Sequence, residues 1–241
     1  MRVFFVCALY ILFSGFTTIE NNFALKKPNH SNWTILLKKY VDNNGNVNYK
    51  SFINENKVVQ NYLNELAKNS PSDDWSKQDK LAYYINLYNA ATVQLILDNY
   101  PKKSIKDIKN PWDKEWIKIG NDIFSLGQIE HKILRKMNDP RIHFAINCAS
   151  YSCPKLSNEA YTTQNIEKQL QKAAFDFIND PKKNKLSENN LQLSNIFKWY
   201  KEDFTQEGSL TDYIKSFTKV NVNSKAKISY LEYDWSLNEA K

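Results

Sequence analysis

The segment that most constrains the fold is DKLAYYINLYNAATVQLILDNYP, residues 79–101, which is apolar on nearly every helical face. Such a helix needs neighbours on all sides, because no face of it is suited to water. It ends at Pro101, since proline cannot continue a helix. We therefore predict a central core helix. Its asparagines, Asn86 and Asn89, must find hydrogen-bond partners, and we favour loop backbone, such as the NCASYS turn, over a substrate.

The remaining patterns predict more helices than strands. Apolar residues recur at helical spacing in several segments, and Ser125 is suited to cap the helix that follows it. Helices are expected over residues 33–42, 50–68, 126–137, 162–180, 196–204 and 209–218. Hairpins are expected over residues 116–126 and 184–195, and single strands over 141–148 and 227–237. The predicted fold class is α+β, a mostly helical single domain packed on a small, largely antiparallel sheet.

The N-terminus predicts an exported protein. A cationic start at Arg2 precedes the apolar run Val3 to Phe13, which is too short to span a bilayer comfortably. This pattern is typical of a secretory signal peptide over residues 1–18, with a linker over 19–30 and one domain over 31–241; an uncleaved N-terminal anchor is the alternative. No later segment is long and apolar enough for a membrane span, so we expect a periplasmic or cell-surface location.

Charge and motifs argue against several kinds of partner. The formal net charge of +7 falls to about +6 without Arg2, and the lysines are scattered among acidic and amide residues. The chain has no basic stripe with interleaved aromatic residues, so we predict no nucleic-acid partner. It has no phosphate-binding glycine loop or dinucleotide motif, so we predict no cofactor. His30 reads as a solvated linker residue.

The stretch RIHFAINCASYSCP, residues 141–154, contains one of three histidines and two of three cysteines. A cysteine nucleophile needs a nearby base, which a histidine can provide. In an exported protein, Cys148 and Cys153 are equally suited to form a disulfide. A zinc site built from both cysteines with His131 and His143 is a weaker alternative, because the spacing matches no known zinc module.

The motifs YYINLYNAATVQLIL, FSLGQIEHKILR, DPRIHFAINCASYSCPKL and YDWSLN resemble the family catalogued as domain of unknown function 547. The similarity runs from about Ser51 to the C-terminus. The family pattern has two asparagines in a core helix, which correspond to Asn86 and Asn89. It also has a helix with the motif IEH-x-ILR, which corresponds here to Glu130, His131 and Arg135.

The resemblance also implies which reactive residues the family shares. Its cysteine-containing strand end corresponds to Cys148. In the plant branch a serine can replace Cys153 and the histidine at His143 can be absent, which favours Cys148 and His131 as the common pair. The resemblance implies no activity, because the family is named for lacking one.

Two functions follow as alternatives. In the first, the protein performs thiol-dependent acyl transfer or amide hydrolysis on a small-molecule or peptide substrate. Cys148 is then the nucleophile, His131 the base with His143 as substitute, and Asn86 the orienting group or oxyanion donor. Glu130 is a further member of the candidate site, pairing with Arg135 or lying near Asn86, and Asp234 is a candidate either to orient a histidine or to cap the strand end. In the second, the domain is a noncatalytic protein- or peptide-binding module with a structural Cys148–Cys153 disulfide.

Overall fold

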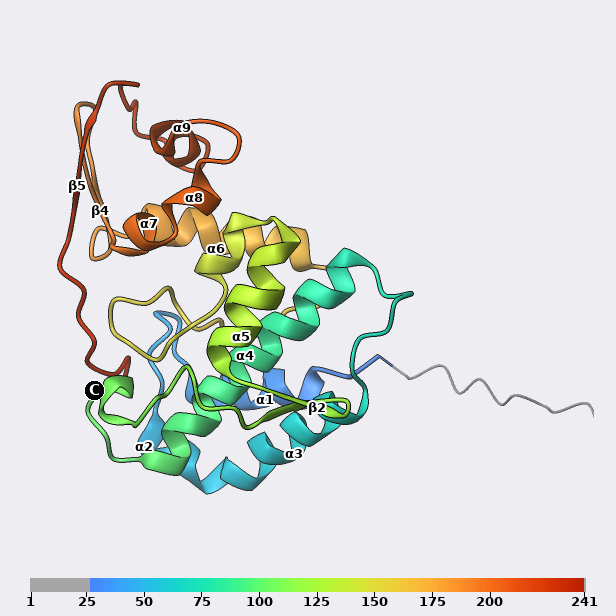
Figure 1. The fold of residues 1–241 in the computed structure, drawn as a ribbon. Coiled ribbons are helices and arrows are strands. Elements are labelled where there is room, and N and C mark those ends of the chain that lie inside the picture. The colour runs from blue at the N-terminus through green and yellow to red at the C-terminus, as the bar shows by residue number, and fades with distance from the viewer. Residues whose placement is uncertain (1–26, 241) are drawn as a thin grey trace, which may run out of the picture.

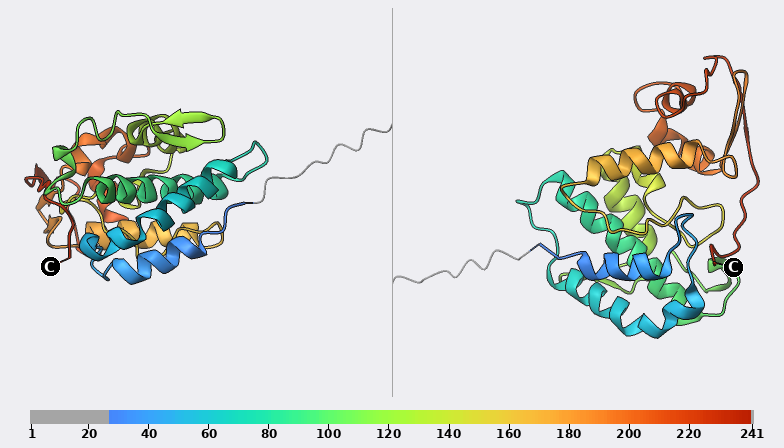
Figure 2. Two further views of the ribbon diagram at one scale, coloured as in Figure 1. Left: turned by 90° about the horizontal axis from the view of Figure 1, so that it is seen from below. Right: turned by 180° about the vertical axis from the view of Figure 1, so that it is seen from behind.

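A computed structural model describes residues 27–240 of the chain. The predicted signal peptide and residues 19–26 of the predicted linker lie outside this range. Within it, helices form a main body and the C-terminal elements form a lobe at one end (Figure 1). The two further views agree on this arrangement (Figure 2). None of the helices in residues 27–240 is long and apolar enough to cross a membrane.

The central helix, α4, spans Lys77–Asn99, as predicted from its apolar pattern. It begins at a capping box in which Ser76 and Asp79 satisfy each other's backbone donors. The middle of the helix is buried on all sides, and α1, α2, α3 and α5 lie around it (Figure 1). Burial on every face explains why this segment needs the rest of the chain to be stable.

Most of the other predicted elements are also present. The helices are α1 Ser31–Tyr40, α2 Tyr49–Phe52, α3 Asn56–Lys68, α5 Leu126–Gln128, α6 Ile166–Ile178, α7 Ile196–Trp199, α8 Lys201–Phe204 and α9 Leu210–Lys215. Short 3-10 segments lie at Ile53–Glu55, Ile105–Asp107, Arg135–Met137 and Pro140–Phe144, and a π-helix at Ile129–Leu134. Ser125 caps α5 in a capping box with Gln128, as expected.

The strands form two small sheets. In the first, β1 Ile117–Ile119 and β2 Asp122–Phe124 form the predicted antiparallel hairpin. In the second, β3 Lys185–Leu186 and β4 Asn190–Leu193 form the other hairpin, and β5 Lys227–Tyr230 adds to β4 in parallel. The predicted α+β class, mostly helical with a small amount of sheet, is therefore confirmed.

The predicted strand over residues 141–148 was wrong. Residues Pro140–Phe144 form a 3-10 turn, and the chain then continues as an irregular loop. Asp139 accepts a hydrogen bond from the Arg141 backbone, and Pro140 fixes the first position of the turn. Other parts of the protein surround and bury the segment. Its residues are therefore mostly apolar, and this apolar content resembles that of a buried strand.

Two hydrophobic clusters hold the described residues together. The larger cluster surrounds α4 and includes Trp33, Tyr83 and Leu87. The smaller one lies under the C-terminal lobe and includes Phe144, Phe177 and Phe197. Because Phe144 belongs to the second cluster while its neighbours Ile142 and Ala145 belong to the first, the end of the 3-10 segment joins the two.

The two asparagines of α4 bind backbone, which confirms the interpretation favoured from the sequence. Asn86 donates to the Tyr161 carbonyl at 2.7 Å and accepts from the Tyr161 amide at 2.9 Å. Asn89 donates to the Ala145 carbonyl at 2.9 Å and accepts from the Asn147 amide at 2.8 Å. Each asparagine side chain thus provides the donor and the acceptor that a neighbouring strand would provide to loop backbone.

His30 is not the solvated linker residue that the sequence suggested. It lies at the start of α1, and its Nδ1 is 2.6 Å from the Tyr62 hydroxyl. The burial that comes with this contact lowers the pKa of His30 to about 4.

We predict that Asn89→Ala lowers the free energy of unfolding by about 3 kcal/mol, because it leaves a buried carbonyl and a buried amide without partners. Asn61→Ala is the matched control, since Asn61 is exposed on α3; we expect its effect to stay within about 0.5 kcal/mol. Urea denaturation measures both. Equal midpoints for the two variants would show that Asn89 does not hold the loop.

We also predict a pH dependence that originates at His30. Its pKa is lower in the folded chain than in the unfolded one, so the stability that it contributes is complete above about pH 6.5 and is lost as the pH falls towards 4. The loss is on the order of 2 kcal/mol. Unfolding free energies of wild type and His30→Gln should therefore diverge between pH 7 and pH 4. Parallel curves would contradict the burial of this histidine.

Candidate functional site

The main candidate site is a cavity of about 440 Å³ between the two hydrophobic clusters. Its walls come from α4, the π-helix, the loop after the 3-10 turn, α7 and the segment that follows β5. The lining residues are Tyr88, Trp112, Asp113, Gly127, Glu130, His131, His143, Ile146, Cys148, Cys153, Pro154, Ile196, Trp199, Tyr200, Tyr233 and Trp235. The cavity therefore depends on segments that are far apart in the sequence.

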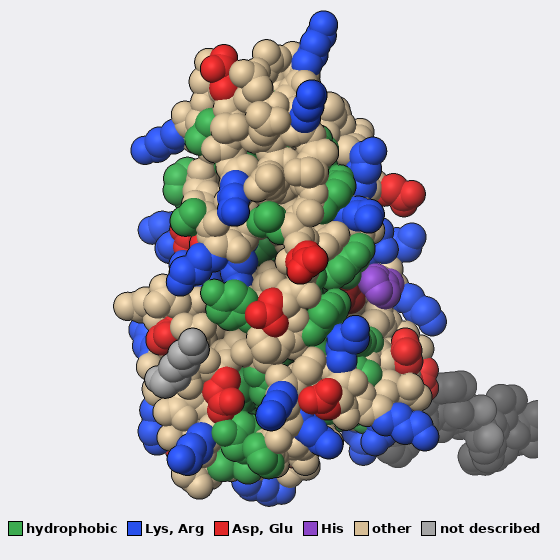
Figure 3. Space-filling view, turned by 90° about the vertical axis from the view of Figure 1, so that its left-hand side faces the viewer, with side chains coloured by type: hydrophobic (Ala, Val, Ile, Leu, Met, Phe, Trp, Pro, Cys, Tyr) green, Lys and Arg blue, Asp and Glu red, His purple; other side chains and the backbone are tan. Residues whose placement is uncertain are grey.

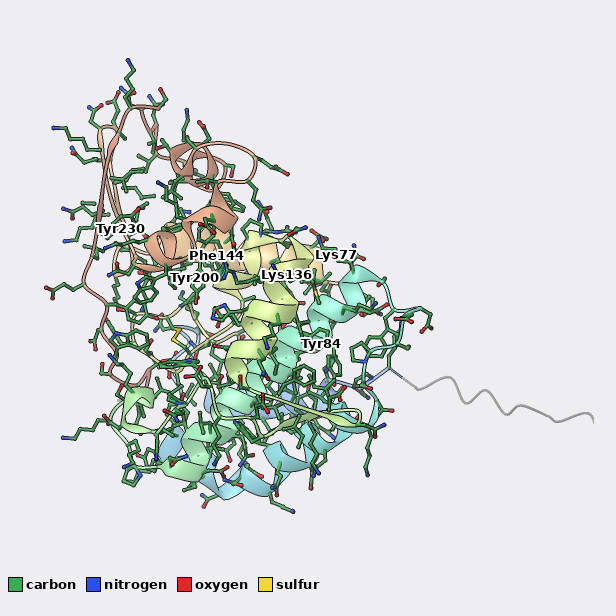
Figure 4. The ribbon with its side chains drawn as sticks, viewed as in Figure 1. Lys77, Tyr84, Lys136, Phe144, Tyr200 and Tyr230 are labelled. Atoms are coloured by element: carbon green, nitrogen blue, oxygen red, sulfur yellow. A yellow bond between two sulfur atoms is a disulfide. The ribbon has the colours of Figure 1, made fainter. Side chains whose placement is uncertain are left out.

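The two cysteines of the loop are joined by a disulfide, which is one of the alternatives that the sequence left open. Cys148 is half-buried and Cys153 is buried. Figure 4 shows the disulfide in yellow below the labelled Tyr200. The bridge closes a short loop in which Ala149 takes a left-handed conformation with φ of 59°. Non-glycine residues rarely adopt that conformation, and its cost is met by the contacts that fix the loop.

Three sets of hydrogen bonds fix this loop. The first comes from Asn89, as described above. The second comes from Asn147, whose side chain donates to the Pro154 carbonyl at 2.7 Å and accepts from the Ala149 amide at 2.8 Å. The third comes from the C-terminal segment, where the Tyr151 amide donates to the Ser236 carbonyl at 2.7 Å. The loop is therefore held on several sides, which makes it a rigid part of the cavity wall.

The Cys148 sulfur lies among hydroxyl groups. Its Sγ is 3.1 Å from the Ser150 hydroxyl and 3.4 Å from the Tyr233 hydroxyl. Within the described residues it makes no hydrogen bond to His131 or His143, although both histidines line the same cavity. The structure thus brings the predicted nucleophile and bases to one cavity without direct contact between them.

Glu130 and His131 lie on the π-helix, Ile129–Leu134, that continues α5. A π-helix is wider than an α-helix and is common at functional sites. Glu130 is buried and His131 is exposed, yet both side chains line the cavity. Adjacent helical residues point in different directions, so the two approach the cavity from different sides.

The Tyr88 hydroxyl binds the Glu130 carboxyl group and donates to its Oε2 at 3.2 Å. Tyr200 lines the same cavity, and the negative charge of Glu130 acts on its hydroxyl through space. Burial raises the pKa of both tyrosines well above its ordinary value, and the negative charge of Glu130 raises it further. Both hydroxyls therefore keep their protons, and the Tyr88 hydroxyl acts as a donor to Glu130.

His143 belongs to a buried polar group with Asp203 and Arg135. Its Nε2 is 2.7 Å from Asp203 Oδ2, and its ring stacks on Tyr200 with centroids 4.0 Å apart. Arg135 binds the same carboxylate through two hydrogen bonds of 2.7 and 2.8 Å. Burial alone would raise the pKa of Asp203, but the hydrogen bonds from Arg135 and His143 outweigh it and hold that pKa well below its usual range.

Aromatic side chains form another part of the lining. Ring centroids are 5.7 Å apart for Trp112 and Trp235, 4.5 Å for Tyr233 and Trp235, and 4.8 Å for Trp199 and Tyr233. Trp199 remains 47% exposed, which places it at the mouth and not in the core. Figure 3 shows one side of the molecule, and hydrophobic and acidic side chains lie next to each other in the middle of that side. We call these four residues, Trp112, Trp199, Tyr233 and Trp235, the aromatic wall.

Two predicted positions differ in the structure, and a third takes one of the roles considered for it. Asn86 does not line the cavity, because both ends of its amide are bound to the Tyr161 backbone. Arg135 pairs with Asp203 and not with Glu130. The Asp234 carboxylate accepts from the Ser236 amide at 2.8 Å, which is the capping role considered for it. In residues 27–240, no group of three or more histidine, cysteine or acidic side chains is arranged to hold a metal ion.

Asp203 and the aromatic wall were not predicted from the sequence. Asp203 lies 60 residues from His143, with no local pattern that relates the two. Tryptophan and tyrosine usually lie in protein cores, so their presence in the sequence does not by itself indicate a ligand site. The cluster YLEYDWS after β5 was the available signal, since it places Tyr233 and Trp235 close together in a polar segment.

Comparison with known proteins identifies the part of the chain that carries most of these residues. Residues 72–178 match the model of the family described as "Protein of unknown function, DUF547". The match includes α4, the π-helix and the disulfide loop, and ends before α7, Tyr233 and Trp235. No curated protein and no solved structure matched the chain. The resemblance seen in the sequence is therefore confirmed over this range, and residues 72–178 belong to the DUF547 family.

Proposed function

We propose that this protein is a binding module that holds a peptide or small-molecule ligand in the cavity beside the disulfide. The observation that carries the proposal is the cavity itself. Its volume of about 440 Å³ lies within the range of ligand sites, and its mostly apolar walls enclose a few polar groups, as such sites require.

The closed disulfide favours binding over covalent chemistry. A bridged cysteine has no thiol to act as a nucleophile, and the Cys148 sulfur is bonded to Cys153. The bridge also fixes the wall that Cys148 and Cys153 contribute, which reduces the loss of conformational entropy when a ligand binds. We interpret the disulfide as a structural part of the binding site.

Thiol chemistry is the second candidate, and the buried His143–Asp203 pair supports it. Nucleophilic cysteines work with a histidine that a third group orients. Asp203 holds His143 through Nε2, and the ring forms no other hydrogen bond within the described residues. If a dithiol reduced the bridge to two thiols, the Cys148 thiolate would add to an acyl carbon. Histidine would protonate the leaving amine, and water would hydrolyse the thioester. His131 is the alternative base.

We further propose that the protein is exported to the periplasm or the cell surface. The N-terminal segment supports this, and so does the disulfide, because such bonds persist in oxidising compartments.

We predict that the native protein keeps both cysteines of the loop protected. Peptide mapping after alkylation without reductant should show Cys148 and Cys153 unmodified and joined, and reduction should make both reactive. Cys7 lies in the predicted signal peptide, so the mapping must read the loop peptide and not the whole-protein mass. Alkylation of Cys148 in the unreduced protein would argue against the structural bridge and in favour of the thiol enzyme.

For the second candidate, we predict that an alkylating reagent modifies Cys148 of the reduced protein rapidly near pH 6. His143→Gln should slow this alkylation about tenfold. His131→Gln is the matched comparison, because it removes the other histidine of the cavity. If neither substitution changes the alkylation rate, no histidine activates this thiol and the enzyme candidate fails.

A further inference from the structure

The charge of the cavity is opposite to that of the chain. The chain has 33 lysines and arginines against 26 acidic residues, yet the lining contains Asp113 and Glu130 and neither a lysine nor an arginine. Lining residues drawn from this composition at random would include about two basic and about two acidic residues. The lining has its two acidic residues and lacks the basic ones, which indicates that the cavity suits a positively charged ligand.

Glu130 is the acidic group placed deepest. It is 5% exposed, and among the described residues no lysine, arginine or histidine forms an ion pair with it. Arg135 follows on the same helical segment, but Asp203 engages its guanidinium through two hydrogen bonds. Among the described residues the Tyr88 hydroxyl forms the side-chain hydrogen bond to the Glu130 carboxyl group, and the charge of Arg135 acts on that group only through space. A buried carboxyl group without an ion-pair partner gains more from a cation than an exposed one does.

The aromatic wall provides the second half of a cation site. The faces of tryptophan and tyrosine attract ammonium and guanidinium groups, most strongly where water is excluded. Two cations from outside the lining already lie over rings of the cavity: Lys106 Nζ is 5.1 Å from the Trp235 centroid, and Arg135 Cζ is 5.4 Å from that of Tyr200. An alkyl chain that carries a positive end would gain apolar contact along this wall as well.

We propose that the cavity selects an organic cation, an alkylammonium group whose stem lies on the aromatic wall and whose charge faces Glu130. This inference rests on the proposed binding function and names the class of ligand. Two sources share the chemistry, the side chain of a lysine in a peptide and a free quaternary ammonium compound, and the experiment separates them.

Calorimetric titration of the full, oxidised chain tests the proposal with three probes. They are Nα-acetyl-lysine methylamide, its neutral counterpart Nα-acetyl-norleucine methylamide, and choline. We expect at least one cation to bind about tenfold more tightly than the norleucine amide, and the preference to shrink as salt is added. Tighter binding of the lysine amide points to a peptide, and tighter binding of choline to a small molecule.

Variants assign the preference to named residues. Glu130→Gln should remove most of the preference for the cation over the norleucine amide. Glu202→Gln is the matched control, because it removes the same charge from an exposed residue near Tyr200 that does not line the cavity. Asp113→Asn is a second test at an exposed lining position, in case Glu130→Gln does not fold.

The outcomes separate the two levels of the proposal. Equal binding of the norleucine amide and both cations would overturn the cation inference and leave the binding function standing. A cation preference that survives both Glu130→Gln and Asp113→Asn would also overturn it. Absence of binding by all three probes would overturn the cation inference and remove the support for the binding function.

Discussion

The hydrogen bonds from Asn89 to the loop that carries the disulfide are the interaction on which the rest of the site depends. The loop after Phe144 has no strand partner, so its buried backbone groups need other donors and acceptors. Asn89 supplies one of each from the middle of the core helix. The most buried element of the protein thereby fixes the loop that places Cys148, and a rigid scaffold of this kind is what a functional loop requires.

The second constraint is that the cavity lies where two hydrophobic clusters meet. The main body contributes Glu130 and Tyr88, and the C-terminal lobe contributes Trp199 and Tyr200. The segment after β5 returns from the lobe to the disulfide loop, where Leu237 pairs with Ser150 (Figure 1). This return completes the aromatic wall. The cavity therefore combines the family-matched segment with residues from the C-terminal lobe and the segment after β5.

The sequence predicted the features that local patterns determine. Residues 79–101 formed the core helix because their apolar pattern leaves no polar face, and Ser125 capped α5 because the groups that it satisfies lie within three residues. Because Asn86 and Asn89 lie in an apolar helix, it was also predictable that their buried amides form hydrogen bonds. The pattern did not identify Tyr161 as a partner. The disulfide remained one of several alternatives, since spacing alone does not determine whether two cysteines bond.

Features that depend on distant residues were not predictable in this way. The stretch 141–148 has the apolar content of a strand, but Asp139 and Pro140 start a 3-10 turn there and Asn89 replaces the missing strand partner. Asp203 reaches His143 across 60 residues, and the π-helix that carries Glu130 has no signature that separates it from an α-helix.

Site-resolved NMR of the protein with 5-fluorotryptophan tests most directly whether the cavity is a ligand site. On titration with Nα-acetyl-lysine methylamide, the signals of Trp112, Trp199 and Trp235 should shift together and saturate. Trp33 is buried in the main core and should not respond. Signals of the cavity tryptophans that stay unchanged, or shifts that include Trp33 equally, would contradict the account.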